Sequence, residues 1–555
     1  MTNWKSGACF MLAAGRAVAA GLGLQHLAGH EAWNALQTAA RVESESQVEI
    51  ASAAFAEQYP EYNLSVPIDH FHNDSRYEPH TDEYFDLRYW FDAKHYRKGG
   101  PVIILAAGET DAKERLPFLD HGILSILAKA TGGVGVVLEH RYYGKSFPVP
   151  DLSTKNLRFL STDQALADTA YFAKHISFPG HEDLNLTAPD TPYLAYGGSY
   201  AGAFAAFLRK LYPEVFWGGI SSSGVTAAII DYWEYYEGAR LFSPGDCAET
   251  TQKLTEVVDK ILLGKSETDK SQLKDLFGLG PLEDDDFAST LSYGISGLQS
   301  TNWDPAQDTT AFGTYCATVS SDSVLFGSTR HLKSSVDELL SASGSDAKLT
   351  NRMLNYVGYV KDYVKKGCKS GDLVKCFSGR NSEEHQNTSI RQGPGRSWIY
   401  QVCTEWGYFQ TGSGVPDDEL PLISRLIDVD YSSIYCREAF NITEPPTYPR
   451  VAIVDGEADP WRAATPHKIG LNRKSTTSEP FLLIDLGVHH WDENGLKPED
   501  VTPDFPPASI KNVQAQEVEF VKAWMKEWEE AQSKDSAKGE VLSIHDYSIE
   551  WLRII

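Results

Sequence analysis

Short apolar runs alternate with amphipathic stretches in two separate parts of the chain. In the first part, one run alternates aromatic and polar residues, as a half-buried strand does, and others are apolar and β-branched, as buried parallel strands are. One stretch between them carries apolar residues at helical spacing. The expected elements are strands at 84–91, 101–107, 134–138, 193–196 and 217–221 and helices at 161–175 and 201–211.

This strand–helix rhythm stops near residue 226. Residues 226–400 have a mostly helical pattern with Asp-, Ser- and Gly-rich connectors. The rhythm returns with apolar strands at 451–454 and 481–484, and a final helix at 513–528 gathers its apolar residues on one face. Strands that alternate with helices indicate a doubly wound α/β sheet, and the interruption indicates a helical cap inserted into it.

With 555 residues, the chain is longer than a single hydrophobic core usually spans, so a domain with a large insertion or two domains are expected. Residues 8–24 resemble the apolar region of a signal peptide, although Arg16 interrupts them. The expected division is a leader or signal segment at 1–45, sheet domain at 46–225 and 441–532, helical cap at 226–440 and C-terminal tail at 533–555.

The charge balance is strongly acidic, with 76 Asp and Glu against 50 Lys and Arg and a formal net charge of −26. Such a surface repels nucleic acid and anionic membranes, so neither is expected as a partner. Beyond the N-terminal segment, no stretch approaches 18 uninterrupted apolar residues, and no membrane span is expected.

Cysteines and glycosylation acceptors favour the secretory pathway. Seven cysteines occur, and loss of Cys9 with a leader would leave six, enough for three disulfides. Their spacing does not fit a zinc site, so no metal is expected. Five Asn-x-Ser/Thr acceptors, more than chance supplies, stand at Asn63, Asn73, Asn185, Asn387 and Asn441. Unused acceptors in a cytosolic protein are the alternative.

The most informative motif lies at residues 193–202, where a short apolar strand runs into Gly-Gly-Ser and then into a buried helix. This strand–turn–helix context predicts a nucleophile elbow that exposes the hydroxyl of Ser199 above the sheet edge. The usual second glycine, two residues after the serine, is Ala201 here, and Gly202 follows it. A Gly-x-Ser pattern arises easily by chance, so the serine needs catalytic partners.

Two later strand ends supply an acid and a base in the order that α/β-hydrolases use. The strand at 451–454 is followed by Asp455 and Asp459; Asp459 stands far enough into its loop to reach a histidine, whereas Asp455 suits a turn. The strand at 481–484 is followed by His489 and His490. We take Asp459 as the acid and His489 as the base, with His490 as the alternative.

An oxyanion hole requires two backbone N–H donors. One is expected from Tyr200, directly after the serine, and one from Glu109, in the loop after the strand at 101–107. Trp461, beside the acid, offers a flat face to a proline ring or packs in the core. Glu405 lies in an aromatic-rich stretch that is expected to border the pocket, where it either recognises a substrate amine or serves a structural role.

These motifs together resemble peptidase family S28, which comprises lysosomal Pro-Xaa carboxypeptidase, dipeptidyl peptidase II and fungal acid prolyl endopeptidases. The resemblance covers about residues 60–530. Its motifs are Ile68-Asp69-His70-Phe71, residues 84–88, Glu139-His140-Arg141-Tyr142-Tyr143-Gly144-Lys145-Ser146, residues 164–168, Gly197–Gly202, Cys403-Thr404-Glu405, Asp459-Pro460-Trp461 and His489-His490.

The resemblance implies an α/β-hydrolase fold with a large inserted helical (SKS-type) cap, cleavage on the carboxyl side of proline and an acidic optimum. It implies the same triad of Ser199, Asp459 and His489. Two departures stand out: the oxyanion loop reads Ala-Ala-Gly-Glu-Thr, and Trp491 replaces a leucine after the paired histidines, where it is expected to narrow or reshape the S1 side.

The sequence therefore predicts a secreted or vacuolar/lysosomal serine peptidase that acts on peptides or flexible polypeptides without a cofactor. An esterase or lipase on the same fold and an inactive binding protein are the alternatives. Endopeptidase, carboxypeptidase and dipeptidyl-peptidase modes stay open, as does a monomeric or homodimeric state.

Overall fold

The computed structural model describes residues 58–304, 310–380, 382–390, 394–442, 454–465, 480 and 482–538. In these residues an eight-stranded sheet has the order β1-β2-β4-β3-β5-β6-β9-β10. The strands are β1 (Tyr62–Pro67), β2 (Tyr84–Asp92), β3 (Val102–Ala106), β4 (Val134–Leu138), β5 (Tyr193–Gly198), β6 (Phe216–Ser222), β9 (Val454–Gly456) and β10 (Leu482–Ile484).

The strand directions gather one set of loops at one edge of the sheet. β2 pairs antiparallel with both β1 and β4, and every neighbouring pair from β4 to β10 is parallel. Because parallel strands end on the same edge, the loops after β3, β5, β6, β9 and β10 meet there.

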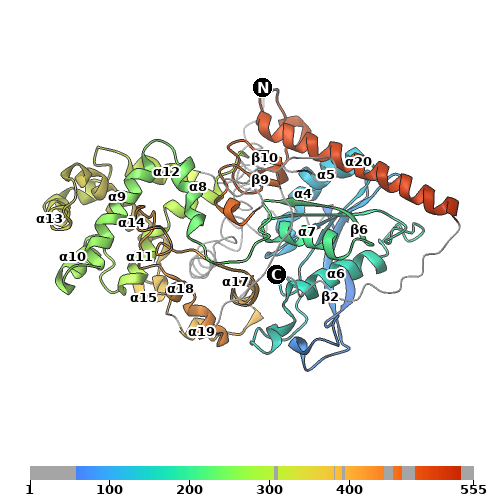
Figure 1. Cartoon of the computed structure of the whole chain (residues 1–555), viewed down its shortest axis with the longest axis horizontal. Helices are drawn as coiled ribbons and strands as arrows, with labels where there is room; N and C mark the ends of the chain where they lie inside the picture. Colours follow the sequence, from blue (N-terminus) through green and yellow to red (C-terminus); the bar gives the residue numbers. More distant parts are fainter. Residues whose placement is uncertain are drawn as a thin grey trace, which may run out of the picture.

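Helices cover both faces of the sheet (Figure 1). Successive residues of β3 point to opposite faces: Ile104 joins one buried cluster and Ile103 the other. The first cluster includes residues of α6 (Thr162–His175) and α7 (Tyr200–Leu211). The second includes residues of α4 (Leu116–Asp120), α5 (Ile123–Thr131) and α20 (Ala508–Lys538).

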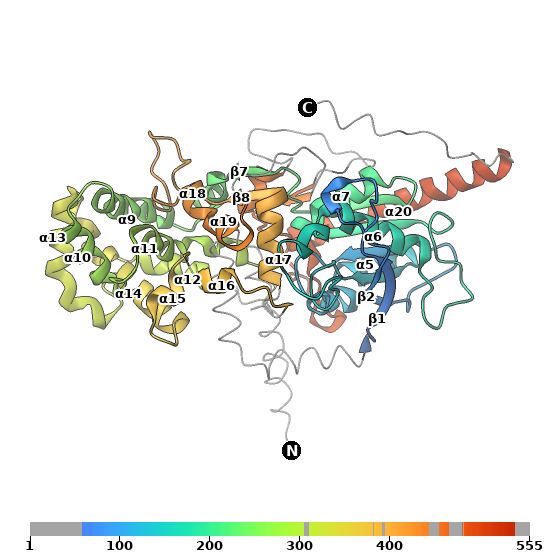
Figure 2. The same cartoon turned by 90° about the horizontal axis from the view of Figure 1, so that it is seen from below.

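A helical body lies to one side of this sheet domain (Figures 1 and 2). It also contains a short parallel pair, β7 (Ile229–Asp231) and β8 (Gly407–Phe409). Its helices are α8 (Glu237–Phe242), α9 (Cys247–Leu262), α10 (Glu267–Phe277), α11 (Asp284–Ser292), α12 (Thr310–Val319), α13 (Lys333–Ser343), α14 (Thr350–Gly367), α15 (Leu373–Phe377), α16 (Ser382–His385), α17 (Pro394–Gln401), α18 (Val429–Ser432) and α19 (Ile434–Phe440).

Six cysteines form three disulfides, which confirms the count expected without Cys9. The bonds are Cys247–Cys316, Cys368–Cys376 and Cys403–Cys436. All three lie in the helical body, where they join elements that share no sheet. Cys9 itself lies outside the described residues.

An α/β-hydrolase fold with an inserted helical region is thus confirmed by the strand order and the position of the helices. Each strand expected between 84 and 221 is present within one or two residues at its ends. The final helix is longer than expected and runs to Lys538, into the segment expected as a tail. The expected leader at 1–45 and most of the strand at 451–454 lie outside the described residues.

Candidate active site

Ser199 occupies a strained turn between β5 and α7. Its backbone has φ 59° and ψ −126°, a conformation that side chains other than glycine rarely adopt. The Ser199 N–H donates to the carbonyl of Ser222 on neighbouring β6, at 2.9 Å. The Ser199 carbonyl accepts from Gly202 N–H, so the helix begins directly at the turn. The predicted elbow geometry is present.

The unusual Ala201 fits because its neighbours are glycines. A Cβ on Gly197 would lie 3.0 Å from the Ala201 Cβ, and one on Gly108 would lie 3.3 Å from it. Gly202 has its own requirement, since a Cβ there would lie 2.6 Å from the Ser222 carbonyl oxygen. The close approach of α7 to the sheet therefore depends on a glycine at position 202, and an alanine is tolerated at position 201.

Asp459 and His489 meet in the interior at the same sheet edge. His489 Nδ1 lies 3.0 Å from each oxygen of the Asp459 carboxylate, and the two residues are 3% and 2% exposed. Asp459 follows β9, and its carboxylate also accepts from Trp461 N–H at 2.9 Å. His489 follows β10, so the two loops come from adjacent parallel strands.

The surroundings favour a charged Asp459 carboxylate beside a neutral His489 imidazole. Burial tends to raise the pKa of Asp459, but the His489 ring and the hydrogen bonds to the carboxylate bring that pKa below its usual value. Burial lowers the pKa of His489 in spite of the nearby carboxylate. The pair is therefore ready to accept a proton at the imidazole.

His490 lies beside His489, with ring centroids 4.6 Å apart, but pairs with a different carboxylate. Its backbone is left-handed, with φ 36°, and its Nδ1 lies 3.1 Å from the Glu493 carboxylate. Its N–H donates to the Ser223 hydroxyl at 2.9 Å. Of the two adjacent histidines, His489 is the one that contacts Asp459. Neither Glu493 nor Ser223 was singled out from the sequence, although Ser223 directly follows a strand at the edge where the loops meet.

The two residues expected to form an oxyanion hole follow adjacent parallel strands, β3 and β5. Glu109 is buried in the loop after β3, and Tyr200 is the first residue of α7. The Tyr200 hydroxyl accepts from Gln401 Nε2 of α17 and lies 2.9 Å from His140 Nε2. These contacts hold the beginning of α7 against both the helical region and the sheet domain.

The three expected pocket residues have different surroundings. The Trp461 ring is buried, with its centroid 6.2 Å from that of His489, and its Nε1 donates to Gln299 Oε1. Trp491 is half-buried, and its Nε1 donates to the carbonyl of Thr301. Both tryptophans thus connect the loops of Asp459 and His489 to the helical body.

Glu405 lies in a π-helical turn, Val402–Trp406, and is bound to the beginning of α6. Its carboxylate accepts from the Thr162 N–H at 3.0 and 3.1 Å and from the Thr162 hydroxyl at 2.8 Å. A carboxylate at a helix N-terminus is favourable because N–H groups there lack partners within the helix. Burial nevertheless raises the pKa of Glu405 to about 7.

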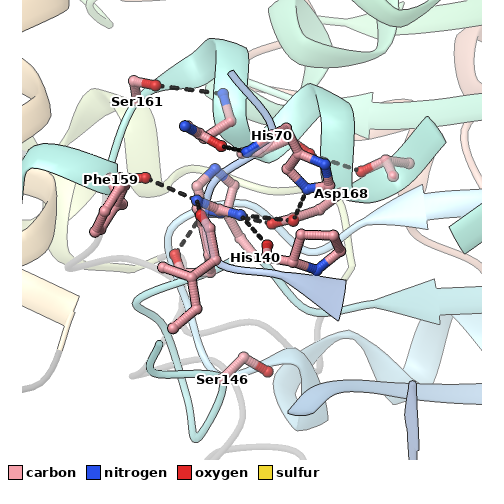
Figure 3. Close-up of polar contacts among 12 residues, drawn as sticks. His70, His140, Ser146, Phe159, Ser161 and Asp168 are labelled. Atoms are coloured by element: carbon pink, nitrogen blue, oxygen red, sulfur yellow. Dashed lines mark hydrogen bonds and ion pairs between the residues drawn. The ribbon is translucent and has the colours of Figure 1, made fainter. Parts of the chain in front are cut away.

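Behind the active-site loops, a buried ion pair links three chain segments. Arg141 donates to both oxygens of the Asp168 carboxylate, at 2.6 Å each, and His70 Nε2 lies 2.8 Å from the same carboxylate (Figure 3). Arg141 also donates to the carbonyls of Ile68 and Phe159. Arg141 thus forms the structural ion pair that its place after a buried strand suggests.

Neither a metal-ion site nor a membrane-spanning helix is found among the described residues. No group of three or more His, Cys, Asp or Glu side chains in this part of the chain is arranged to hold a metal ion. Among the same residues, no helix is both long and apolar enough to cross a membrane.

The family profile described as "Serine carboxypeptidase S28" matches residues 67–503. The "Probable extracellular serine carboxypeptidase" of Arthroderma benhamiae is 49% identical over 488 residues, which cover 84% of this chain and 68% of the relative. "Serine protease vicPb" of Bipolaris victoriae is 29% identical over 445 residues, which cover 73% of this chain and 80% of the relative. A solved structure, "Peroxisomal alpha-beta-hydrolase Lpx1" of Saccharomyces cerevisiae, aligns over 88% of this chain and 99% of its own with 9% identity and a TM-score of 0.32, too low to support an inference.

Proposed function

The chain belongs to the serine carboxypeptidase S28 family of serine-type peptidases, and we propose that it hydrolyses peptide bonds on the carboxyl side of proline with Ser199, Asp459 and His489 as its triad. The observation that carries this proposal is the buried Asp459–His489 pair, with both carboxylate oxygens 3.0 Å from Nδ1. It lies at the sheet edge that also carries the strained Ser199 turn.

In the proposed reaction, the Ser199 hydroxyl attacks the carbonyl carbon of the prolyl bond while its proton passes to His489 Nε2. Asp459 orients the imidazole through Nδ1 and stabilises the imidazolium that forms. The N–H groups of Tyr200 and Glu109 stabilise the negative oxygen of the tetrahedral intermediate. His489 then protonates the leaving amine, and water releases the peptide acid from the acyl-serine by the reverse proton transfers.

The preference for proline is proposed from the resemblance to family S28, and the aromatic residues beside His489 form part of the core. Trp461 lies beside His489 and packs against Tyr232, Tyr235 and Tyr408, with ring centroids 5.0–5.4 Å apart. These contacts bury the Trp461 ring, which is 2% exposed, and we propose core packing as its role. For Trp491, half-buried in the loop of His489, we propose a place on the S1 side of the substrate pocket. For Glu405 we propose a structural role, since its carboxylate is engaged by Thr162.

Secretion, or delivery to a vacuole or lysosome, is supported by three observations. The relative from Arthroderma benhamiae is named extracellular, and this chain carries three disulfides, which form in oxidising compartments. All five glycosylation acceptors, at Asn63, Asn73, Asn185, Asn387 and Asn441, are exposed. We propose that they are glycosylated, and that the cap is the 226–440 insertion between sheet segments 46–225 and 441–532.

The decisive experiment uses a fluorogenic peptide with proline before the scissile bond. Ser199→Ala, Asp459→Asn and His489→Ala should each lower kcat by about 10³- to 10⁴-fold. His490→Ala should lower kcat far less. A fluorophosphonate probe should label the wild type and fail on Ser199→Ala. Turnover of esters alone would refute the peptidase assignment, and folded wild type without labelling would indicate an inactive binding protein.

The same substrate distinguishes the modes of attack. Products from a proline-containing peptide with free ends, and with each end blocked, are compared by mass spectrometry. Cleavage that requires a free carboxyl end identifies a carboxypeptidase, and cleavage that requires a free amino end a dipeptidyl peptidase. Cleavage with both ends blocked identifies an endopeptidase. Activity measured from pH 3 to 8 tests the proposed acidic optimum.

A further inference from the structure

Ser223, the first residue after β6, has an unusual backbone for a buried serine. Its φ is 44°, in the left-handed region, and its side chain is 0% exposed. Glycine adopts this conformation without strain, whereas a residue with a Cβ does so at a cost. Because glycine would fit this backbone better, the hydroxyl of Ser223 is expected to have a function of its own.

The Ser223 hydroxyl contacts the loops of both the acid and the base. It accepts from the N–H of His490 at 2.9 Å. It is also one of the groups whose hydrogen bonding lowers the pKa of the Asp459 carboxylate, after His489 and the N–H of Trp461. A hydroxyl has one proton to donate and two lone pairs. The proton therefore goes to the carboxylate, which has only acceptor atoms, and a lone pair receives the peptide N–H.

The preceding residue, Ser222, contacts the remaining parts of the same site. Its carbonyl accepts the N–H of Ser199 at 2.9 Å, and its hydroxyl donates to the Asp492 carboxylate at 2.6 Å. The end of β6 therefore holds the nucleophile turn with one residue and the acid and base loops with the next.

We propose that Ser223 is a positioning residue whose hydroxyl holds Asp459 and the His489–His490 loop in place beside Ser199; this inference rests on the triad proposed above. Ser223 does not contact the reacting atoms. It acts through Asp459 directly and through His489 by way of one peptide unit, so its loss should disturb catalysis more than substrate binding.

Two substitutions separate the hydroxyl from the backbone strain, and a neighbouring serine provides the control. Ser223→Ala removes the hydroxyl and keeps the strained backbone, whereas Ser223→Gly removes the hydroxyl and relieves the strain. Ser221 is also buried in β6, and its hydroxyl has no hydrogen-bond partner within the described residues. Ser221→Ala therefore removes a comparable group that positions nothing.

The readouts are kcat and KM on the proline peptide, the pH profile of kcat/KM, and the melting temperature. Both Ser223 variants should lose about 10- to 100-fold in kcat with little change in KM, since misplacement of a catalytic group has effects of this size. Ser221→Ala should stay within about twofold of wild type.

The pH profile reports on the hydrogen bond itself. Loss of a donor to the Asp459 carboxylate raises the proton affinity of the Asp459–His489 pair, so the acidic limb should move to higher pH in both variants. The other ionisable groups whose charge bears on this pair, His490, Glu493 and Tyr232, are unchanged by the substitution. A side chain that served packing alone would leave the limb in place.

Several results would overturn the inference. Wild-type kcat in either folded Ser223 variant would do so, as would a loss of activity with an unmoved acidic limb. If both Ser223 variants fail to fold while Ser221→Ala folds, the role is structural. Failure of the triad is recognised separately, because Ser199→Ala and Asp459→Asn would then keep their activity whatever the Ser223 variants do.

Discussion

Replacement of Arg141 by methionine should destabilise the sheet domain by about 3–5 kcal/mol, the usual cost of leaving a buried charge without its partner. Arg141 is 0% exposed, and all of its donor groups are engaged. Two hydrogen bonds go to the Asp168 carboxylate and the rest to backbone carbonyls of Pro67, Ile68 and Phe159. Methionine fills similar space but leaves Asp168 buried with only His70 beside it.

The magnitude has two sources that a double-mutant cycle separates. Each backbone carbonyl that loses its donor contributes about 1 kcal/mol, and the uncompensated Asp168 charge contributes the remainder. In Arg141→Met with Asp168→Leu, no charge is left unpaired at this point, so the double variant should lose about 2 kcal/mol less than the sum of the two single variants.

Pulse proteolysis in urea measures these differences on the intact, disulfide-bonded chain. The fraction that resists a brief protease pulse gives the urea concentration at the unfolding midpoint of each variant. A surface substitution, Lys174→Met, serves as the matched loss of a positive charge, because Lys174 forms only a 3.6 Å ion pair with the exposed Glu214. A cost below about 1 kcal/mol for Arg141→Met, or strict additivity in the cycle, would refute the account of Asp168 as a buried charge held by Arg141.

Three further predictions follow from other contacts. Glu405→Gln should melt higher than wild type at pH 8 but not at pH 4, because the buried Glu405 carboxylate, with its pKa near 7, is costly once ionised; parallel melting curves across pH would contradict this. The disulfide Cys247–Cys316 closes a loop of 69 residues, and its removal should destabilise the cap by about 4 kcal/mol. The disulfide Cys368–Cys376 closes a loop of 8 residues, and its removal should cost about 2.5 kcal/mol. A larger loss for the shorter loop in urea unfolding would count against the loop-entropy argument. Gly202→Ala should cost at least about 2 kcal/mol and most activity, since its Cβ would lie 2.6 Å from a backbone oxygen, whereas Gly313→Ala in α12 meets nothing within 4 Å and should be neutral or stabilising in the same melting assay.

The parts of the fold that could be predicted are those with a strong local signal. β4 was expected at its observed bounds because five consecutive apolar residues fill a strand that is buried on both faces. The turn at Ser199 was identifiable because glycine and serine must stand where strand and helix meet. Asp459 and His489 followed from their places after apolar strands, since parallel strands deliver such loops to one edge.

Other features depend on contacts between segments that are far apart in the chain. β1 was missed because a six-residue edge strand with Asn63 and Ser65 between its apolar residues gives a weak pattern. β7 and β8 have three residues each and are separated in the chain by nearly the whole insertion, so no local sequence pattern indicates them. The positioning contacts of Ser223 were invisible for the same reason: a serine after a strand is common, and its partners come from two distant loops.

The buried carboxyl groups divide by their partners into two sets whose contributions to stability change with pH in opposite directions. Asp168 beside Arg141 and Asp459 beside His489 have lowered pKa values despite burial, so they add stability above about pH 4, the unfolded Asp value, which is lost as the pH falls through their folded pKa values. Burial raises the pKa of Glu405 and Glu517, so their contribution is complete below about pH 4.3, the unfolded Glu value, and is lost as the pH rises through their folded pKa values. Both contributions are complete together only at about pH 4, between the unfolded Asp and Glu values. The same burial lowers the pKa of His489.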